Sequence, residues 1–153
     1  MSDDFQMTIS IPSDDDGYIL LQCEHCGNLF KATAEDIESD EILHIFCPSC
    51  GLISDDYLTE DVINLALNKA SNYAEDLLYD AFKDLERHSK NGLISFKAGP
   101  KPQHRSEDPI RSGIEALQIT HFPCCSRSAK IKPLLRMTGC YCPFCGVKNY
   151  DVE

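Results

Sequence analysis

Nine cysteines are the residues of this 153-residue chain whose type and spacing suggest chemistry. Four of them form two pairs, Cys23 with Cys26 and Cys47 with Cys50, and in each pair two residues separate the cysteines and Gly follows the second one. Thiolates at this spacing bind one Zn²⁺ in tetrahedral geometry, and Gly permits the left-handed turn that directs backbone amides toward sulfur. The sequence therefore predicts a metal site formed by Cys23, Cys26, Cys47 and Cys50.

A second group of cysteines lies later in the chain and is less regular. Residues 142–145 repeat the spacing of the first two pairs, so another pair of ligands must precede them. His121 and Cys124 have the required separation, whereas Cys124 and Cys125 are adjacent and their side chains should diverge. Cys125 and Cys140 remain alternative ligands. We expect the second metal site to consist of His121, Cys124, Cys142 and Cys145.

The pattern over residues 18–54 resembles the zinc-ribbon family, in which turns at the tips of two β-hairpins supply four ligands. Residues 119–125 align with residues 21–27 as a weaker repeat, which places Cys125 at the position of Gly27. Rubredoxins bind iron through the same type of turn, but they usually surround it with aromatic side chains, which are few here. The resemblance implies two structural Zn²⁺ ions per chain.

The elements that must position these ligands can be read from hydrophobic periodicity. Short strands are expected at residues 5–11, where apolar and polar residues alternate, and at residues 18–22, where apolar residues cluster. Further strand candidates are residues 93–96 and 114–122. A linker rich in Pro and charged residues is expected at 99–109. From Leu58 to His88, apolar residues recur at steps of three and four, which indicates a long amphipathic helix.

The expected fold class is α+β, with two small zinc-ribbon β modules flanking a long central α-helix. Four segments follow from this interpretation. They are an N-terminal β-hairpin and zinc ribbon at 1–54, the amphipathic helix at 55–92, a short strand and linker at 93–112, and a C-terminal zinc ribbon at 113–153.

Charge and composition limit the classes of function. The chain has 25 acidic and 14 basic residues, a formal net charge of −11, and Lys31 is the only Lys or Arg in the first sixty residues. Such a molecule is repelled by phosphate, which disfavours general nucleic-acid binding. The acidic start is unlike a secretory signal and no apolar run could span a membrane, so we expect a cytoplasmic location and no membrane partner.

No arrangement of residues suggests an enzyme, because four protein ligands close a zinc site to substrate and no nucleophile–base set or phosphate loop is present. We therefore expect a non-catalytic protein-interaction module, an accessory or adaptor subunit that docks on a larger protein assembly. The long helix has more apolar surface than two small ribbons can cover. It should contact the partner, or a second copy of the chain, through Leu77, Leu78 and Phe82.

The alternative function is nucleic-acid binding, in transcription or a phage-related process, through the C-terminal ribbon. That segment is the only part of the chain with a basic tendency, and its bases could form one positive face. The candidate residues are Arg127, Lys130, Lys132, Arg136 and Lys148.

Overall fold

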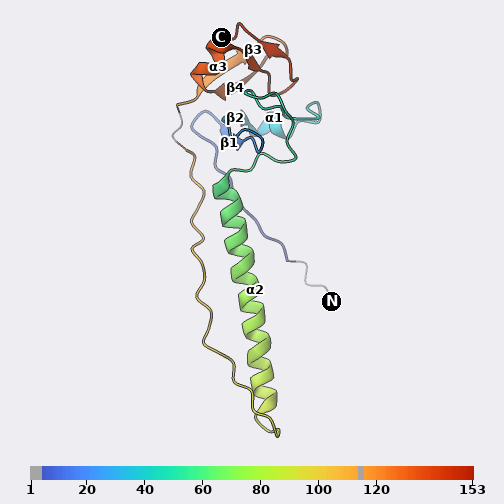
Figure 1. The fold of residues 1–153 in the computed structure, drawn as a ribbon, viewed down its shortest axis with the longest axis vertical. Helices are drawn as coiled ribbons and strands as arrows, with labels where there is room; N and C mark the ends of the chain where they lie inside the picture. Colours follow the sequence, from blue (N-terminus) through green and yellow to red (C-terminus); the bar gives the residue numbers. More distant parts are fainter. Residues whose placement is uncertain (1–4, 114–115) are drawn as a thin grey trace. The chain divides into compact units, whose positions relative to one another are not determined.

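The computed structural model describes residues 5–113 and 116–153, which form two compact units (Figure 1). The helical unit comprises the described residues of Met1–Ser10 together with Asp61–Pro109. The sheet unit comprises Ile11–Glu60 and the described residues of Ile110–Glu153. The polypeptide therefore leaves the sheet unit, forms most of the helical unit, and returns to complete the sheet.

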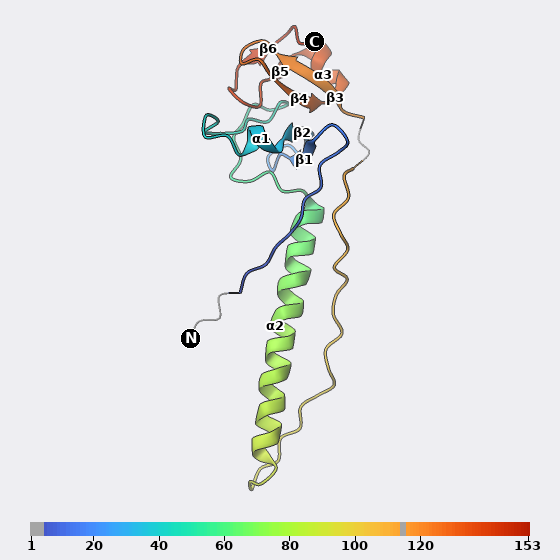
Figure 2. The same cartoon turned by 180° about the vertical axis from the view of Figure 1, so that it is seen from behind.

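The sheet unit contains a four-stranded antiparallel sheet in the order β1-β2-β4-β3 and a small two-stranded sheet (Figure 2). Two short helices, α1 (Ala34–Ile37) and α3 (Pro133–Thr138), each follow the second strand of a hairpin. The strands are β1 (Tyr18–Gln22), β2 (Leu29–Thr33), β3 (Gln118–Phe122), β4 (Arg127–Ile131), β5 (Cys140–Tyr141) and β6 (Lys148–Asn149).

The β1–β2 and β3–β4 hairpins are structural repeats. In the first, the amide of Gly27 donates to the carbonyl of Cys23 at 2.8 Å; in the second, the amide of Ser126 donates to the carbonyl of Phe122 at 2.9 Å. This equivalence makes Lys31 and Lys130 corresponding residues, and the two are paired where β2 meets β4. Equivalent positions of the two hairpins thus face each other, as they do in a symmetric dimer.

The core of the sheet unit is shared by both repeats. Phe30 from the first hairpin and Phe122 and Ile131 from the second are fully buried in one cluster. Burying each of these large side chains contributes roughly 1.5–3 kcal/mol. The two hairpin regions, which the sequence analysis assigns to separate segments, therefore stabilise each other through common apolar contacts.

The helical unit is built around α2, which runs from Glu60 to Ser89. The segment after the helix lies beside it in Figures 1 and 2, and Asn72, which is buried, holds that segment. The Asn72 side chain accepts from the amide of Arg105 at 2.8 Å and donates to its carbonyl at 3.0 Å, and Asn68 donates to the Ser106 carbonyl at 2.9 Å. These bonds satisfy backbone groups of residues 105 and 106, which pair with no strand among the described residues.

The α+β fold class is confirmed: a long helix is flanked by β-hairpin regions that each carry a four-cysteine cluster. The helical segment was expected at 55–92, with apolar periodicity from Leu58 to His88, and the helix covers Glu60–Ser89. The strand expected at 5–11 is wrong for the described residues, because Phe5 stacks on Tyr73 of α2 instead of joining a sheet. The strand expected at 93–96 is also absent. The strand expected at 114–122 is β3, which begins at Gln118. Positions 114 and 115 lie outside the described residues.

No helix in the described part of the chain combines the length and the apolarity that are needed to cross a membrane.

Candidate metal centres

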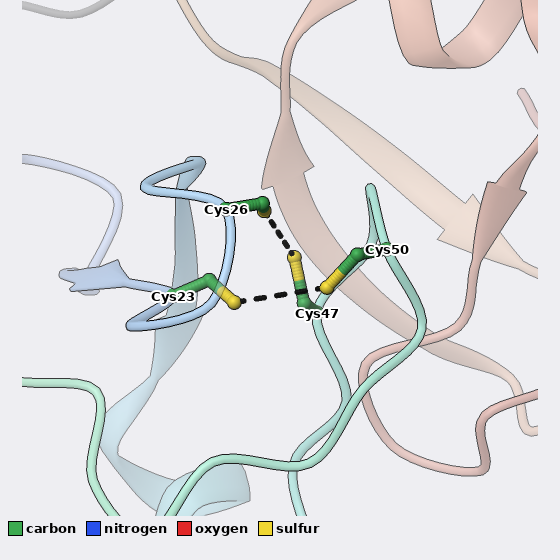
Figure 3. Close-up of side chains that lie close together, drawn as sticks. All are labelled: Cys23, Cys26, Cys47 and Cys50. Carbon is green, nitrogen blue, oxygen red and sulfur yellow. Dashed lines mark hydrogen bonds between the residues drawn. The ribbon is translucent and has the colours of Figure 1, made fainter.

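The first four-cysteine cluster lies between two turns of the sheet unit (Figure 3). Cys23 and Cys26 come from the turn after β1, and Cys47 and Cys50 come from a turn closed by the bridge between Phe46 and Ile53. The sulfur of Cys23 lies 3.8 Å from that of Cys50, and Cys26 lies 3.6 Å from Cys47. A tetrahedral ion with Zn–S bonds near 2.3 Å requires sulfurs about 3.8 Å apart. Two of the six sulfur–sulfur distances therefore match this geometry, and all four sulfurs lie within 4.8 Å of one another.

Local backbone geometry explains why these cysteines converge. Gly27 and Gly51 adopt φ values of 70° and 71°, in the left-handed region that glycine occupies without steric cost. This conformation lets each glycine amide donate to the carbonyl of the first cysteine of its pair, at 2.8 Å in both turns. The amide of Ser49 also donates to the Cys47 sulfur at 3.4 Å. Backbone amides near sulfur stabilise the thiolate form that a metal binds.

Burial and hydrogen bonding act in opposite directions on the thiols without metal. Burial opposes the ionisation of Cys23, but hydrogen bonds from the amides of Cys26 and His25 outweigh it and lower the pKa of Cys23 to about 7. Burial dominates at Cys47, so its pKa is raised. A cluster with one readily ionised thiol and one resistant thiol is expected to release protons when a cation binds.

The second cluster consists of Cys124, Cys125, Cys142 and Cys145, with all sulfurs within 4.8 Å of one another. Cys125 lies 3.5 Å from Cys142, and Cys145 lies 3.3 Å from Cys124. The Asn149 side chain donates to the Cys124 sulfur at 3.6 Å. Like the first cluster, it could hold one metal ion with four sulfur ligands.

This ligand set corrects the expectation for His121. His121 lies on β3, and its Nδ1 is 3.3 Å from the Ser128 hydroxyl on β4, away from the cysteine cluster. Cys125 takes its place among the four. The sequence alignment of the repeats was one residue out of register, because Ser126, with φ 57°, occupies the position of Gly27.

The corrected register also explains why two adjacent cysteines can share one site. Phe122 occupies the position of Cys23 and is fully buried in the core, so the first ligand of the usual pair is missing. Cys125 corresponds to Cys26, and Cys124, which corresponds to His25, supplies the fourth sulfur. Cys140 is buried in the core, outside the cluster, and burial raises its pKa.

The turns that carry the second cysteine pair of each cluster contact each other reciprocally. The amide of Phe46 donates to the carbonyl of Pro143 at 2.8 Å, and the amide of Tyr141 donates to the carbonyl of Pro48 at 2.9 Å. A Cβ atom on Gly51 would lie 2.8 Å from the ring of Tyr141. Likewise, a Cβ atom on Gly146 would lie 2.8 Å from the ring of Phe46. The two candidate metal sites are therefore joined by direct hydrogen bonds and side-chain packing between these turns.

The structure pairs two bases of the C-terminal repeat with acids of the N-terminal repeat. Arg127 forms ion pairs with Asp36 at 2.6 Å and Glu41 at 2.7 Å, and Lys130 forms them with Asp14 and Asp16. Among the other candidate bases for a nucleic-acid surface, Arg136 donates to Gln118, Lys148 lies over the rings of Tyr141 and Tyr150, and Lys132 is exposed.

The cluster of Asp14, Lys31 and Lys130 was missed in the sequence analysis. Its only sequence signal was that Lys31 is the single base in an acidic segment. Both ammonium groups bind the same Asp14 oxygen.

The expected partner-binding residues of the helix are exposed. Leu77, Leu78 and Phe82 retain 52%, 57% and 47% of their accessible surface. Phe82 contacts Phe96 of the following segment, with ring centroids 5.8 Å apart. These side chains thus remain largely uncovered within the described chain.

Comparisons with known proteins do not assign the chain to a family. A scan against protein-family models, a search of curated proteins and a search of solved structures each found no match to the chain.

Proposed function

We propose that the protein is a non-catalytic protein-interaction module in which two Zn²⁺ ions stabilise the sheet unit and α2 contacts the partner. The observation that carries this proposal is the row of exposed leucines on α2, of which Leu67, Leu77 and Leu78 each retain more than half of their surface. Large exposed apolar residues on one helix commonly mark protein-interaction surfaces.

The donor sets favour zinc and a structural role. Each site offers four cysteine sulfurs, and closed tetrahedral all-thiolate sites are typical of structural zinc. Four protein ligands leave no position for substrate or water, so these sites would contribute folding energy and not a reaction. The sheet unit then serves as a rigid base for an accessory or adaptor subunit.

The ion pairs described above weigh against the nucleic-acid alternative. Lys130 and Arg127 each contact two carboxylates, so their charge is not available to phosphate without breaking these pairs. Together with the net charge of −11, this leaves interaction with protein as the function that the geometry supports best.

An affinity experiment with the zinc-loaded chain tests the proposal. Leu78→Asp should release the bound proteins, while Leu93→Asp, which places the same change at an exposed leucine outside α2, should retain them. Equal recovery with both variants would contradict the assignment to α2. Tight binding of the chain to DNA or RNA that weakens steeply with salt would support the alternative instead.

A further inference from the structure

The exposed apolar residues of α2 form one continuous stripe along the helix. Their positions follow one another at steps of three and four, which keeps them on a single face. The stripe comprises Ile63, Leu67, Ala70, Ala74, Leu77, Leu78, Ala81 and Leu85, all of them exposed.

The opposite face of the helix is already occupied by the chain itself. Asn68 and Asn72 hold the backbone of residues 105 and 106, and His104 contacts Asp76 at 2.9 Å. Because 68, 72 and 76 are four residues apart, they lie on one face, and that face points away from Ala74. The stripe is therefore the face of α2 that lacks a covering segment among the described residues.

We propose that the stripe binds the stripe of a second copy of this chain, with the two α2 helices antiparallel and Ala74 at the centre. This proposal rests on the proposed function, in which α2 contacts a partner, and identifies that partner as a second copy of the chain. In this arrangement the three leucines nearest the centre meet small residues, and Ile63 meets Leu85 at the two ends of the contact. Leu67 lies opposite Ala81, Leu78 opposite Ala70, and Leu77 opposite Ser71. Alternation of large and small residues across a contact permits close packing of two helices.

Charge favours the antiparallel orientation over the parallel one. The helix begins with Glu60 and Asp61, and its last turn contains Arg87 and His88. Antiparallel helices place Glu60 and Asp61 of one copy beside Arg87 and His88 of the other, whereas parallel helices place Glu60 and Asp61 beside the same two acids of the other copy. The helix dipoles also oppose each other favourably in the antiparallel pair. A partner with an unrelated sequence needs neither the internal symmetry of the stripe nor this charge pattern.

Two double variants of the full, zinc-loaded chain distinguish these arrangements by sedimentation equilibrium. In the antiparallel dimer position 67 of one copy meets position 81 of the other. Leu67→Lys with Ala81→Glu therefore brings opposite charges together and should retain a dimer. Leu67→Lys with Ala81→Lys brings like charges together and should raise the dissociation constant about 100-fold or more. Helical circular dichroism and zinc content should be the same in both variants.

Three outcomes would overturn the proposal. One is a wild-type chain that stays monomeric at every concentration, another is equal dissociation of the two double variants, and the third is a dimer that survives in both. If the wild-type chain is monomeric but Leu78→Asp still releases partner proteins in the affinity experiment, the proposed function stands and only the second copy is excluded as its partner.

Discussion

Lys31 and Lys130 face each other across β2 and β4, and both donate to the same oxygen of Asp14, at 3.1 Å and 2.8 Å. The two side chains are only 5% and 12% exposed, so their charges need a counterion inside the structure. Asp14, from the turn before β1, supplies it. Asp14 therefore bridges the two repeats, while Asp16 also contacts Lys130 at 2.6 Å and the Gly113 carbonyl accepts from Lys31 at 3.3 Å.

Replacing Asp14 should destabilise the sheet unit. Asp14→Ala removes the carboxylate that two adjacent lysines share, while Asp16 still contacts Lys130, so the loss should be about 1–3 kcal/mol. Urea denaturation of the zinc-loaded chain at pH 7 measures this effect. Asp15→Ala, an exposed neighbour, is the control and should change stability by less than about 0.5 kcal/mol. A loss at Asp14 no larger than at Asp15 would mean that the lysines are adequately solvated.

The same contacts set a pH dependence with a defined sign. Burial opposes the ionisation of Asp14, but hydrogen bonds from Lys130, the Tyr18 amide and Lys31 outweigh it, so the pKa of Asp14 lies well below its usual value of 3.8. A carboxyl whose pKa is lowered on folding adds stability above its unfolded pKa and loses it as pH falls through the folded value. The difference in stability between wild type and Asp14→Asn should therefore be constant from pH 5 to pH 8. A difference that disappears at pH 6 would contradict this linkage.

Metal analysis of protein purified without chelators should find two zinc ions per chain, one for each cysteine cluster. Removal of zinc should unfold the sheet unit, because metal affinity is folding energy for such sites, while α2 should keep part of its helical signal. Circular dichroism before and after chelation measures both effects. Iron with a red colour would indicate the rubredoxin-like alternative, and unchanged structure after complete zinc removal would show that the shared core suffices.

Substitutions around the second cluster test its ligand set. Cys125→Ser should reduce the zinc content from two ions to one, because it removes one of four sulfurs. His121→Ala should keep both ions, because the imidazole contacts Ser128 and not the cluster. Cys140→Ser is a second control, since this buried thiol also lies outside the cluster. Loss of zinc in His121→Ala with retention in Cys125→Ser would restore the original assignment.

The contact between the two turns can be tested with a matched pair of glycines. Gly51→Ala adds a Cβ atom 2.8 Å from the Tyr141 ring, whereas Gly27→Ala, at nearly the same φ, meets nothing within 4 Å. Gly27→Ala should therefore cost only the left-handed strain of roughly 1–2 kcal/mol, and Gly51→Ala should cost at least about 1 kcal/mol more. Thermal or urea unfolding compares the two. Tyr141→Ala should remove most of the additional cost, and equal stabilities of the two Ala variants would argue against this contact.

The first metal site was predictable because its signal is local. Cys23, Cys26, Cys47 and Cys50 follow a spacing that the backbone of two turns dictates, and α2 follows from a periodicity sustained over many turns. The second site was predictable only in part. Recognising Cys125 as a ligand requires knowing that Ser126 takes the left-handed conformation, which is uncommon for a non-glycine residue.

Contacts between distant segments had no comparable signal. The pairing of Lys31 with Lys130 and the packing of Tyr141 on Gly51 join residues that lie far apart in sequence and have no spacing rule. At residues 5–11 the sequence pattern predicted a strand that the structure does not contain. This alternating pattern is typical of a strand, but the segment contacts α2 through Phe5 and pairs with no strand in the described part of the chain.

The reciprocal packing of the two turns has a consequence for how the chain is made. Once residue 50 has left the ribosome, all ligands of the first cluster are present and zinc can bind. Tyr141, whose ring packs on Gly51 beside this cluster, is synthesised only after residues 61–109 of the helical unit. The same is true of β4, the second neighbour of β2 in the sheet. At usual translation rates, residues 51–145 take about 5–20 s to emerge. Throughout that interval β2 of the nascent N-terminal repeat lacks its neighbour β4 and presents an open strand edge, to which a chaperone could bind.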